Sequence, residues 1–277
     1  MKSLANRIIL ITGSTDGLGK AVAFEMAGKG ATILLHGRNP HKGEAVVKEI
    51  RNASGNSNHI YHNADFSSLQ QVHFLCDKIL SQTDQLYMLV NNAGIGGGEK
   101  KNIREVGTDG YELRFTVNYL SHFLLTTHLL TLLKKSAPSK IINVVSGAQE
   151  PINFNDVMME NNYNGSRAYA QSKLALVMFT FYLANELKDK GITVNCLHPA
   201  SMMDTKMVRE GGGKPRTAVQ EGVDTVMYVA TSPETENITG AYFDHHKQIR
   251  AEKQAYDENA RNKLNELSIR LSKLPGT

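Results

Sequence analysis

The chain has 277 residues, of which 41% are hydrophobic and 21% are charged. That length and balance are typical of a soluble globular protein that buries a full core, and they exclude a wholly disordered chain, a collagen and a disulfide scaffold. The formal net charge of +4 is small and evenly spread, and no basic helix is present, so nucleic-acid binding is not indicated.

The cysteines and the N-terminus bear on the compartment. Cys76 and Cys196 lie in apolar runs and belong to no metal-type cluster, so we expect buried free thiols in a reducing compartment. No stretch approaches the about 18 apolar residues of a membrane span. The apolar run from Ile8 to Ile11 is shorter than the about 7 residues that a signal peptide needs. We therefore expect a cytoplasmic protein without membrane association.

Short apolar runs alternate with helical patterns along the whole chain. The predicted strands are Arg7–Thr12, Ala31–His36, His59–His62, Leu86–Asn91, Lys140–Val145 and Thr193–Leu197. The predicted helices lie near Leu18–Lys29, Lys42–Ala53, Leu69–Thr83, Tyr111–Lys135 and Ala168–Lys190. Several runs are apolar throughout, as in strands buried on both faces. The alternation predicts one α/β domain over residues 1–277, with a doubly wound, mostly parallel sheet of the Rossmann type.

The C-terminal segment has a different pattern. One helical face carries Tyr256, Ala260, Leu264, Leu267 and Leu271 within charged surroundings. This spacing predicts an amphipathic helix, over about residues 247–272, that packs on the body of the domain. A partner interface is the alternative.

A glycine-rich segment, Thr12 to Gly19, directly follows the first predicted strand and opens the first helix. Its spacing is Gly-x3-Gly-x-Gly. Glycines let the backbone approach a diphosphate closely, and a helix N-terminus favours its negative charge. A dinucleotide site is therefore predicted, with a tight strand–helix turn as the alternative.

The end of the second predicted strand indicates which dinucleotide. It runs into His36-Gly37-Arg38-Asn39, without the acidic residue that would bind the ribose 2′-hydroxyl of NAD. An Arg at this place accommodates the 2′-phosphate of NADP. The segment predicts NADP(H), with Arg38 as an ordinary surface residue as the alternative.

A tyrosine and a lysine are spaced for proton transfer. Tyr169 and Lys173 are four residues apart, hence on one helical face. An ammonium beside the phenol would lower its pKa of about 10 and let Tyr169 pass a proton to a carbonyl oxygen. Ser146 ends the fifth predicted strand, at the edge where α/β sheets hold ligands, and could hydrogen-bond the same oxygen.

In order along the chain, these motifs resemble the short-chain dehydrogenase/reductase family, most of all its retinol-dehydrogenase-like branch. The resemblance reaches to about Asp244 and includes Asn91 to Gly94, Val117 to Leu125 and Leu197 to Pro199. It departs at Ala200, where the family usually has Gly, and the Thr that normally follows is displaced by one, at Thr205.

The resemblance implies a role for each matching residue. Tyr169 would be the acid/base, Lys173 would bind the nicotinamide ribose and lower the pKa of Tyr169, and Ser146 would orient the carbonyl. Asn118 would hold the helix backbone and a relay water, and Asp65 would bond the adenine amino group, which Phe66 also flanks. The full expected cofactor set is Gly13, Ser14, Thr15, Asp16, Gly17, Leu18, Gly19, Arg38, Asn39, Asp65, Phe66, Asn91, Ala93, Gly94, Tyr169, Lys173, Pro199 and Thr205.

Two segments, 147–166 and 201–216, are expected to cover the active site. The second contains Met202, Met203 and Met207, followed by Gly211–Gly213, and we expect it to act as a mobile lid. Methionine is flexible and suits irregular apolar ligands, which favours an apolar aldehyde or ketone as substrate. Ordinary packing of these methionines is the alternative.

The sequence thus predicts an NADP(H)-dependent oxidoreductase that moves hydride between nicotinamide and a carbonyl/alcohol pair, and a homo-oligomer is compatible with it. A catalytically silent, cofactor-binding regulator or scaffold of the same fold is the alternative. No metal site is predicted, because adjacent His245 and His246 point to opposite faces of a strand. A further set of histidines without partner spacing is expected at the surface: His41, His59, His62 and His73.

Overall fold

The computed structural model describes residues 3–98 and 102–273. Its centre is an 8-stranded sheet in the order β3-β2-β1-β4-β5-β6-β7-β8, in which β8 runs antiparallel to β7 and the other neighbours are parallel. The strands are β1 Ile8–Ile11, β2 Thr32–Gly37, β3 Ile60–Asn63, β4 Met88–Asn91, β5 Ser139–Val144, β6 Ile192–His198, β7 Tyr242–Asp244 and β8 Lys247–Ile249.

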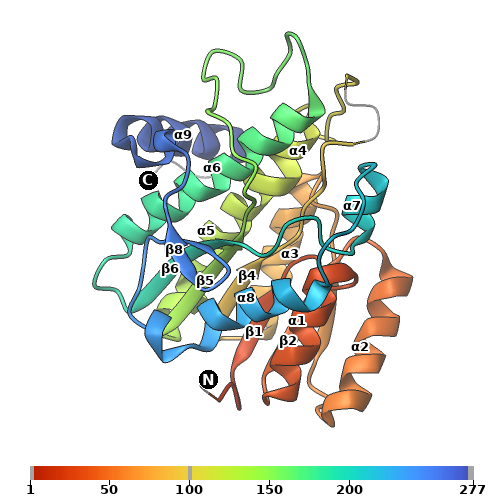
Figure 1. Ribbon diagram of the computed structural model, residues 1–277. Coiled ribbons are helices and arrows are strands. Elements are labelled where there is room, and N and C mark those ends of the chain that lie inside the picture. Colours follow the sequence, from red (N-terminus) through yellow and green to blue (C-terminus); the bar gives the residue numbers. More distant parts are fainter. Residues whose placement is uncertain (1–2, 99–101, 274–277) are drawn as a thin grey trace.

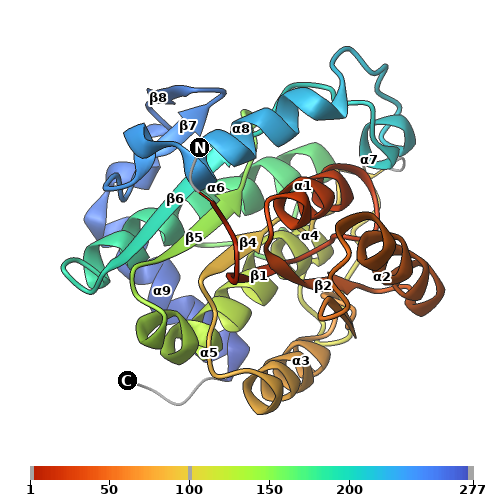
Figure 2. The same cartoon turned by 90° about the horizontal axis from the view of Figure 1, so that it is seen from below.

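Helices cover both faces of the sheet (Figures 1 and 2). Their bounds are α1 Gly17–Gly28, α2 Pro40–Ser54, α3 Leu69–Gln82, α4 Leu113–Phe115, α5 Ser121–Lys135, α6 Gly165–Glu186, α7 Lys206–Glu210, α8 Val219–Thr231 and α9 Glu258–Ser272. Two apolar clusters result, one on each face. Successive residues of β2 show the alternation, since Ile33 belongs to the cluster that includes α1, α2 and α8, whereas Leu34 belongs to the one that includes α3, α5 and α6. The predicted doubly wound single domain is confirmed.

The order of the strands reverses between β1 and β4, which are neighbours at the centre of the sheet. Ligands of open α/β sheets bind at such a switch point, outside the carboxyl ends of the strands. In this chain those ends are Ile11, Asn91, Val144 and His198. The loops that follow them carry most of the residues singled out by the sequence.

Two predicted elements need correction. The C-terminal helix does not begin at residue 247, because Lys247–Ile249 pairs with β7 and Asp257 caps α9 by accepting from Ala260 N at 3.2 Å. The helix does pack on the body, with Leu264 1% exposed. The helix predicted over Tyr111–Lys135 is interrupted by a π-helical turn, Thr116–Leu120, between α4 and α5.

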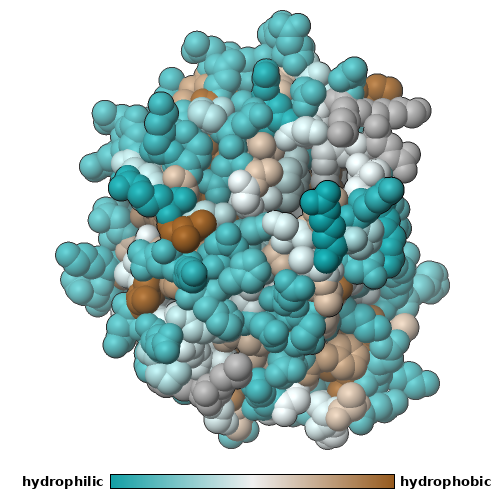
Figure 3. All heavy atoms as spheres, viewed as in Figure 1, coloured by the Kyte–Doolittle hydropathy of each residue, from teal (hydrophilic) through white to brown (hydrophobic). Residues whose placement is uncertain are grey.

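The histidine prediction was also wrong in part, because His59 and His62 are 0% and 1% exposed. Both face the core from around β3. The two cysteines are buried and free, as expected. No helix within residues 3–98 and 102–273 has the length and apolarity to cross a bilayer. The face in Figure 3 is largely hydrophilic, with apolar side chains scattered over it.

Candidate active site

The glycine-rich turn joins β1 to α1 with two residues in the left-handed region, Gly13 at φ +64° and Gly17 at φ +50°. A Cβ on Gly13 would lie 2.8 Å from Ala93 Cα, so only glycine lets this turn approach the loop after β4. Asp16 caps α1 by accepting from Gly17 N at 2.9 Å. The backbone N–H groups and the positive end of the α1 dipole are thereby directed at the carboxyl edge of the sheet.

The Thr12 hydroxyl fixes this turn to the loop after β4. It accepts from Asn92 N at 2.8 Å and from Ala93 N at 2.9 Å, and the residue is fully buried. In the opposite direction, the side-chain amide of Asn92 donates to Thr12 O at 2.8 Å. The two loops that flank the switch point therefore form one hydrogen-bonded unit.

The residues that the sequence predicts to bind near the 2′-phosphate of NADP lie just after the end of β2. Arg38 and Asn39 are exposed, and Asn39 caps α2 by accepting from Lys42 N at 3.0 Å. Lys42 also pairs with Asp16 at 2.8 Å, and its hydrogen bond is the main cause that lowers the pKa of Asp16. Asp16 thus serves the helix cap and an ion pair, while the Arg38 guanidinium has no pairing partner among the described residues.

Tyr169, Lys173 and Ser146 come together as predicted. The Tyr169 phenol lies near enough to the Ser146 hydroxyl for that hydroxyl to influence its pKa. Lys173, 3% exposed, has its Nζ 5.9 Å from the centre of the Tyr169 ring and donates to Val144 O at 3.0 Å. One helical turn of α6 therefore places a phenol and an amine beside the end of β5.

The pKa values depart from the sequence-based expectation. Burial raises the pKa of Tyr169 above its ordinary 10.0, opposed by the hydrogen bond with Ser146. Burial lowers the pKa of Lys173 to about 8. The lowering of the Tyr169 pKa by Lys173 is therefore not seen in this arrangement, because the Lys173 amine is directed at the main chain and desolvation dominates at both groups.

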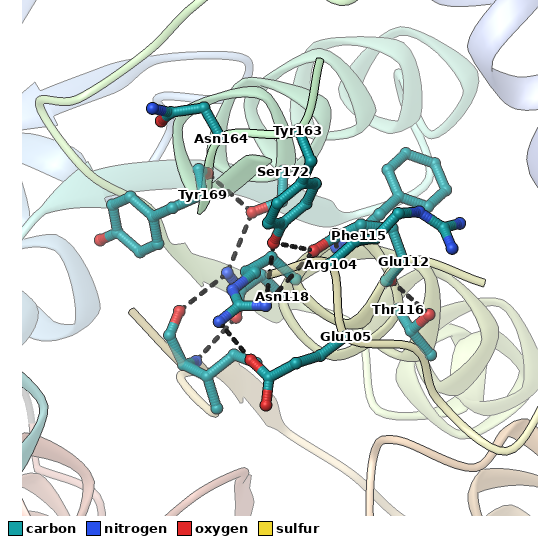
Figure 4. A network of polar contacts seen from close by, with 12 residues as sticks. Arg104, Glu105, Glu112, Phe115, Thr116, Asn118, Tyr163, Asn164, Tyr169 and Ser172 are labelled. Carbon is teal, nitrogen blue, oxygen red and sulfur yellow. Dashed lines mark hydrogen bonds and ion pairs between the residues drawn. The ribbon is translucent and has the colours of Figure 1, made fainter. Parts of the chain in front are cut away.

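The π-helical turn places Asn118 between the β4 loop and α6. Its side chain accepts from Ile95 N at 2.8 Å, and it donates to Ile95 O at 3.1 Å and to Ser172 Oγ at 2.9 Å. The Ser172 hydroxyl in turn donates to Tyr169 O at 2.7 Å (Figure 4). Such turns within α-helices are frequent at functional sites. Ser172 was not among the predicted site residues; its only signal was its place between Tyr169 and Lys173.

A buried charged cluster supports the start of α6. Arg114 donates to Tyr163 Oη at 2.9 Å and to Gly96 O at 3.2 Å, and it pairs with Glu105 at 2.7 Å. Glu112, 1% exposed, accepts from Tyr163 Oη and from Phe115 N. The cluster links α4, the β4 loop and the segment before α6. In Figure 4 the Tyr169 ring points away from it.

Three predicted cofactor residues direct their side chains elsewhere. Ser14 is fully buried and accepts from His36 N at 3.0 Å. Phe66 stacks on the His36 ring with centroids 4.3 Å apart, in the core. Asn91 donates to Thr126 Oγ1 and Asn143 Oδ1 inside the fold. Their strand or turn positions turn these side chains inward, so only their main chains are available at the sheet edge.

The segment 201–216 lies against both the glycine-rich turn after β1 and the loop after β4. Thr205 Cγ2 lies 3.5 Å from where a Cβ on Gly17 would be, and Met207 Cγ lies 3.4 Å from such a Cβ on Gly96. Pro199, at its root, accepts from Thr225 Oγ1 at 2.8 Å. Within the described residues no group of three or more His, Cys, Asp or Glu side chains is arranged as a metal site.

The residues present fit a dinucleotide. Along the switch point the site offers the α1 N-terminus, the close-packed glycines and, at its far end, Tyr169 and Lys173. A Cβ on Gly94 would lie 3.2 Å from Asn118 Oδ1 and 3.4 Å from Lys173 Nζ, so glycine here leaves room for these side chains close to the loop after β4. The resulting cradle is lined by backbone, as a diphosphate and two riboses require.

Residues 7–214 match the family model for short chain dehydrogenases, and the chain belongs to this family. It is similar to human retinol dehydrogenase 14, 36% identical with 95% of this chain and 85% of that protein covered, and to human retinol dehydrogenase 13, 34% identical with 97% and 85% covered. The chain is therefore an oxidoreductase that acts on a CH–OH/C=O pair, and the alternative of a silent scaffold is set aside.

Solved structures agree with this fold. A Mycobacterium paratuberculosis protein superposes with a TM-score of 0.81 at 24% identity, covering 99% of this chain and 96% of that one. The Pseudomonas aeruginosa RhlG/NADP complex superposes with a TM-score of 0.70 at 26% identity, covering 87% and 95%. An Escherichia coli short chain dehydrogenase complexed with NADPH gives 0.71 at 27%, covering 88% and 99%.

Proposed function

We propose that this oxidoreductase uses NADP(H) and reduces an apolar aldehyde or ketone at neutral pH. The observation that carries the proposal is the convergence of Tyr169, Ser146 and Lys173 at the carboxyl end of β5, beside the glycine cradle. The dinucleotide supplies or accepts hydride when bound. Ser146 orients the substrate oxygen and Tyr169 gives it a proton, since the raised pKa keeps the phenol protonated at pH 7. Lys173 binds the nicotinamide ribose, and Asn118 holds the relay that refills Tyr169.

Two observations support NADP(H) over NAD(H). The Arg38 guanidinium is exposed at the end of β2 with no acidic residue beside it in the chain. Two similar structures, RhlG and the Escherichia coli enzyme, are complexes with NADP or NADPH. The guanidinium is suited to a 2′-phosphate, whereas an acid at this place would repel it.

Two further observations support an apolar substrate. Similar proteins are named as retinol dehydrogenases, enzymes of a largely hydrocarbon alcohol. Met202 and Met207, 37% exposed each, lie on the segment 201–216, where flexible apolar side chains can adapt to such a molecule. We assign 201–216 as the lid. The cytoplasmic location and the homo-oligomer stay predictions from the sequence.

The decisive experiment compares the natural protein with Tyr169→Phe. We expect turnover of carbonyls with NADPH to fall by about a thousandfold or more, because the proton donor is lost, while NADPH binding by fluorescence stays within about twofold. Tyr182→Phe, on the same helix but outside the site, is the control and keeps its activity. Retained turnover in Tyr169→Phe contradicts the proposed proton donor.

A substrate panel tests the proposed class. Aliphatic aldehydes, retinal and charged keto acids are compared by NADPH absorbance, with NADH in parallel. We expect the apolar carbonyls to have the highest kcat/KM. A strict preference for charged carbonyls would contradict the apolar substrate, and equal use of NADH would contradict the role of Arg38.

A further inference from the structure

His122 contacts two parts of the candidate site from inside the core. It lies in α5, one turn after Asn118, and is fully buried. Its Nε2 is 3.1 Å from Thr12 Oγ1, and its Nδ1 is 3.1 Å from Asn118 O. The ring thus bridges the hydroxyl that holds the glycine loops together and the main chain of the π-helical turn.

Counting protons leaves one consistent assignment for this bridge. Asn118 O can only accept, so Nδ1 carries the proton. Thr12 Oγ1 already accepts from Asn92 N and Ala93 N, so both its lone pairs are used and its own proton must go outward. His122 Nε2 at 3.1 Å is nearer than the other acceptor, Val90 O at 3.4 Å. The neutral ring therefore accepts from Thr12 and donates to Asn118.

If the His122 ring were doubly protonated, its Nε2–H would face the Thr12 hydroxyl, whose two lone pairs already accept from Asn92 N and Ala93 N. The surroundings oppose that state as well, since burial, helped by the nearby Lys173 and His36 and opposed by the hydrogen bond to Asn118 O, lowers the pKa of His122 to about 3. The Phe66 ring packs edge-on against His122 at 5.3 Å, and His36 stacks behind Phe66 and accepts from Gly13 N at 3.2 Å. The His122 ring thus contacts Thr12 directly, and through Phe66 it is packed toward His36, which also contacts the glycine turn.

The bridge continues to the phenol's helix. Asn118, held by His122 at its carbonyl, uses its side chain to fix Ile95 and Ser172, and Ser172 contacts Tyr169 O. We infer that His122 is a positioning residue, which as a neutral donor and acceptor sets the place of Asn118, and through it of Tyr169, relative to the dinucleotide cradle. The inference rests on the proposed role of Tyr169 as proton donor.

The test compares two substitutions that differ in hydrogen bonding. His122→Leu removes both contacts while filling similar space, and His122→Gln keeps one N–H donor and one oxygen acceptor. His128→Leu, on the same helix and only partly buried, is the matched control. We expect His122→Leu to lower kcat by about tenfold or more, with little change in the KM for NADPH, and His122→Gln to restore most of it.

The pH profile separates positioning from a general loss of stability. We expect His122→Leu to shift the apparent pKa of kcat, since Tyr169 moves relative to Ser146 and Lys173, whereas His128→Leu leaves the profile in place. A kcat for His122→Leu within about twofold of the natural protein, or a loss with an unchanged profile and no rescue by Gln, overturns the inference. If Tyr169→Phe keeps turnover, the proposed function fails instead, whatever the His122 variants do.

Discussion

The Lys173 amine donates to Val144 O at 3.0 Å and lies 5.9 Å from the centre of the Tyr169 ring, so it faces the end of β5 and the phenol together. The main-chain oxygen satisfies one of three donors on a side chain that is 3% exposed. The remaining donors are available to a ribose hydroxyl. Binding of the cofactor would therefore supply hydrogen-bond acceptors to a buried amine that has only one acceptor among the described residues of the folded protein.

Lys173→Met should stabilise the fold while abolishing turnover. The pKa of Lys173 falls from 10.5 to about 8 on folding, so below pH 8 the protonated amine costs stability, and this cost disappears as the pH rises toward 10.5. At pH 7 the gain from Met is at most about 3 kcal/mol, less the lost contact with Val144 O. Urea unfolding at pH 7 and at pH 9.5 measures it. A stabilisation by Lys173→Met that increases with pH would contradict the lowered pKa of Lys173.

The two directions of the reaction should differ in pH dependence. Reduction needs the protonated phenol, and the raised pKa of Tyr169 preserves it, so its rate should be flat from about pH 6 to about pH 9. Oxidation needs the phenolate, so its rate should rise over this range. Initial rates in both directions, in one buffer series with saturating cofactor, check this. An oxidation rate that is flat at neutral pH contradicts the raised pKa.

Arg38→Ala should weaken NADPH binding by about tenfold to a hundredfold and leave NADH binding unchanged, because a charge-assisted contact with the 2′-phosphate is lost. Titration of cofactor fluorescence gives both dissociation constants. Arg270→Ala, exposed on α9, is the control. Equal weakening of both cofactors would show that Arg38 does not read the phosphate.

Arg114→Met should destabilise the fold by about 3–5 kcal/mol, because it leaves the Glu112 carboxylate buried without its cation. Arg167→Met removes an exposed partner of Glu150 and should cost about 1 kcal/mol or less. Denaturant midpoints of the two variants give the comparison. Similar losses in both would mean that the buried cluster adds no stability beyond a surface pair.

NADPH should protect the lid from trypsin. The Lys206 and Arg209 side chains are 63% and 60% exposed on segment 201–216, so a bound cofactor that orders this segment should slow cleavage there several-fold. Lys190, exposed at the opposite edge of the sheet, is an internal control site. Mass spectrometry of timed digests locates the cuts. Equal protection at both sites would indicate global stabilisation rather than a lid.

Most of the sheet follows from the sequence, because its central strands are apolar on both faces. β7 and β8 escape that rule: each has three residues, and Lys247–Ile249 is exposed. The segment Lys247–Ile249 is a strand because it pairs with Tyr242–Asp244, and no local sequence pattern indicates that pairing.

The proximity of Tyr169 and Lys173 was predictable from their spacing and from their place after the strand that ends at Ser146, but their environment was not. The π-helical turn at Asn118 depends on contacts with Ile95 and Ser172 that are distant in sequence. His122 stands out in the sequence only as part of the family resemblance of Val117 to Leu125, since nothing local reveals that its ring contacts Thr12. The inward orientation of Asn91 likewise follows from the register of β4 beside β5, which pairs it with Asn143.

Helix α9 lies along the outer side of α6 (Figure 2), where Ser268 meets Tyr119 at 2.6 Å and Asn265 meets Tyr182 at 3.1 Å. Shortened versions of the protein that end before Glu258 would expose the apolar flank of the helix that carries the phenol. Such versions would be prone to aggregation and poorly expressed, so recombinant work should shorten the loops and keep the C-terminal helix α9.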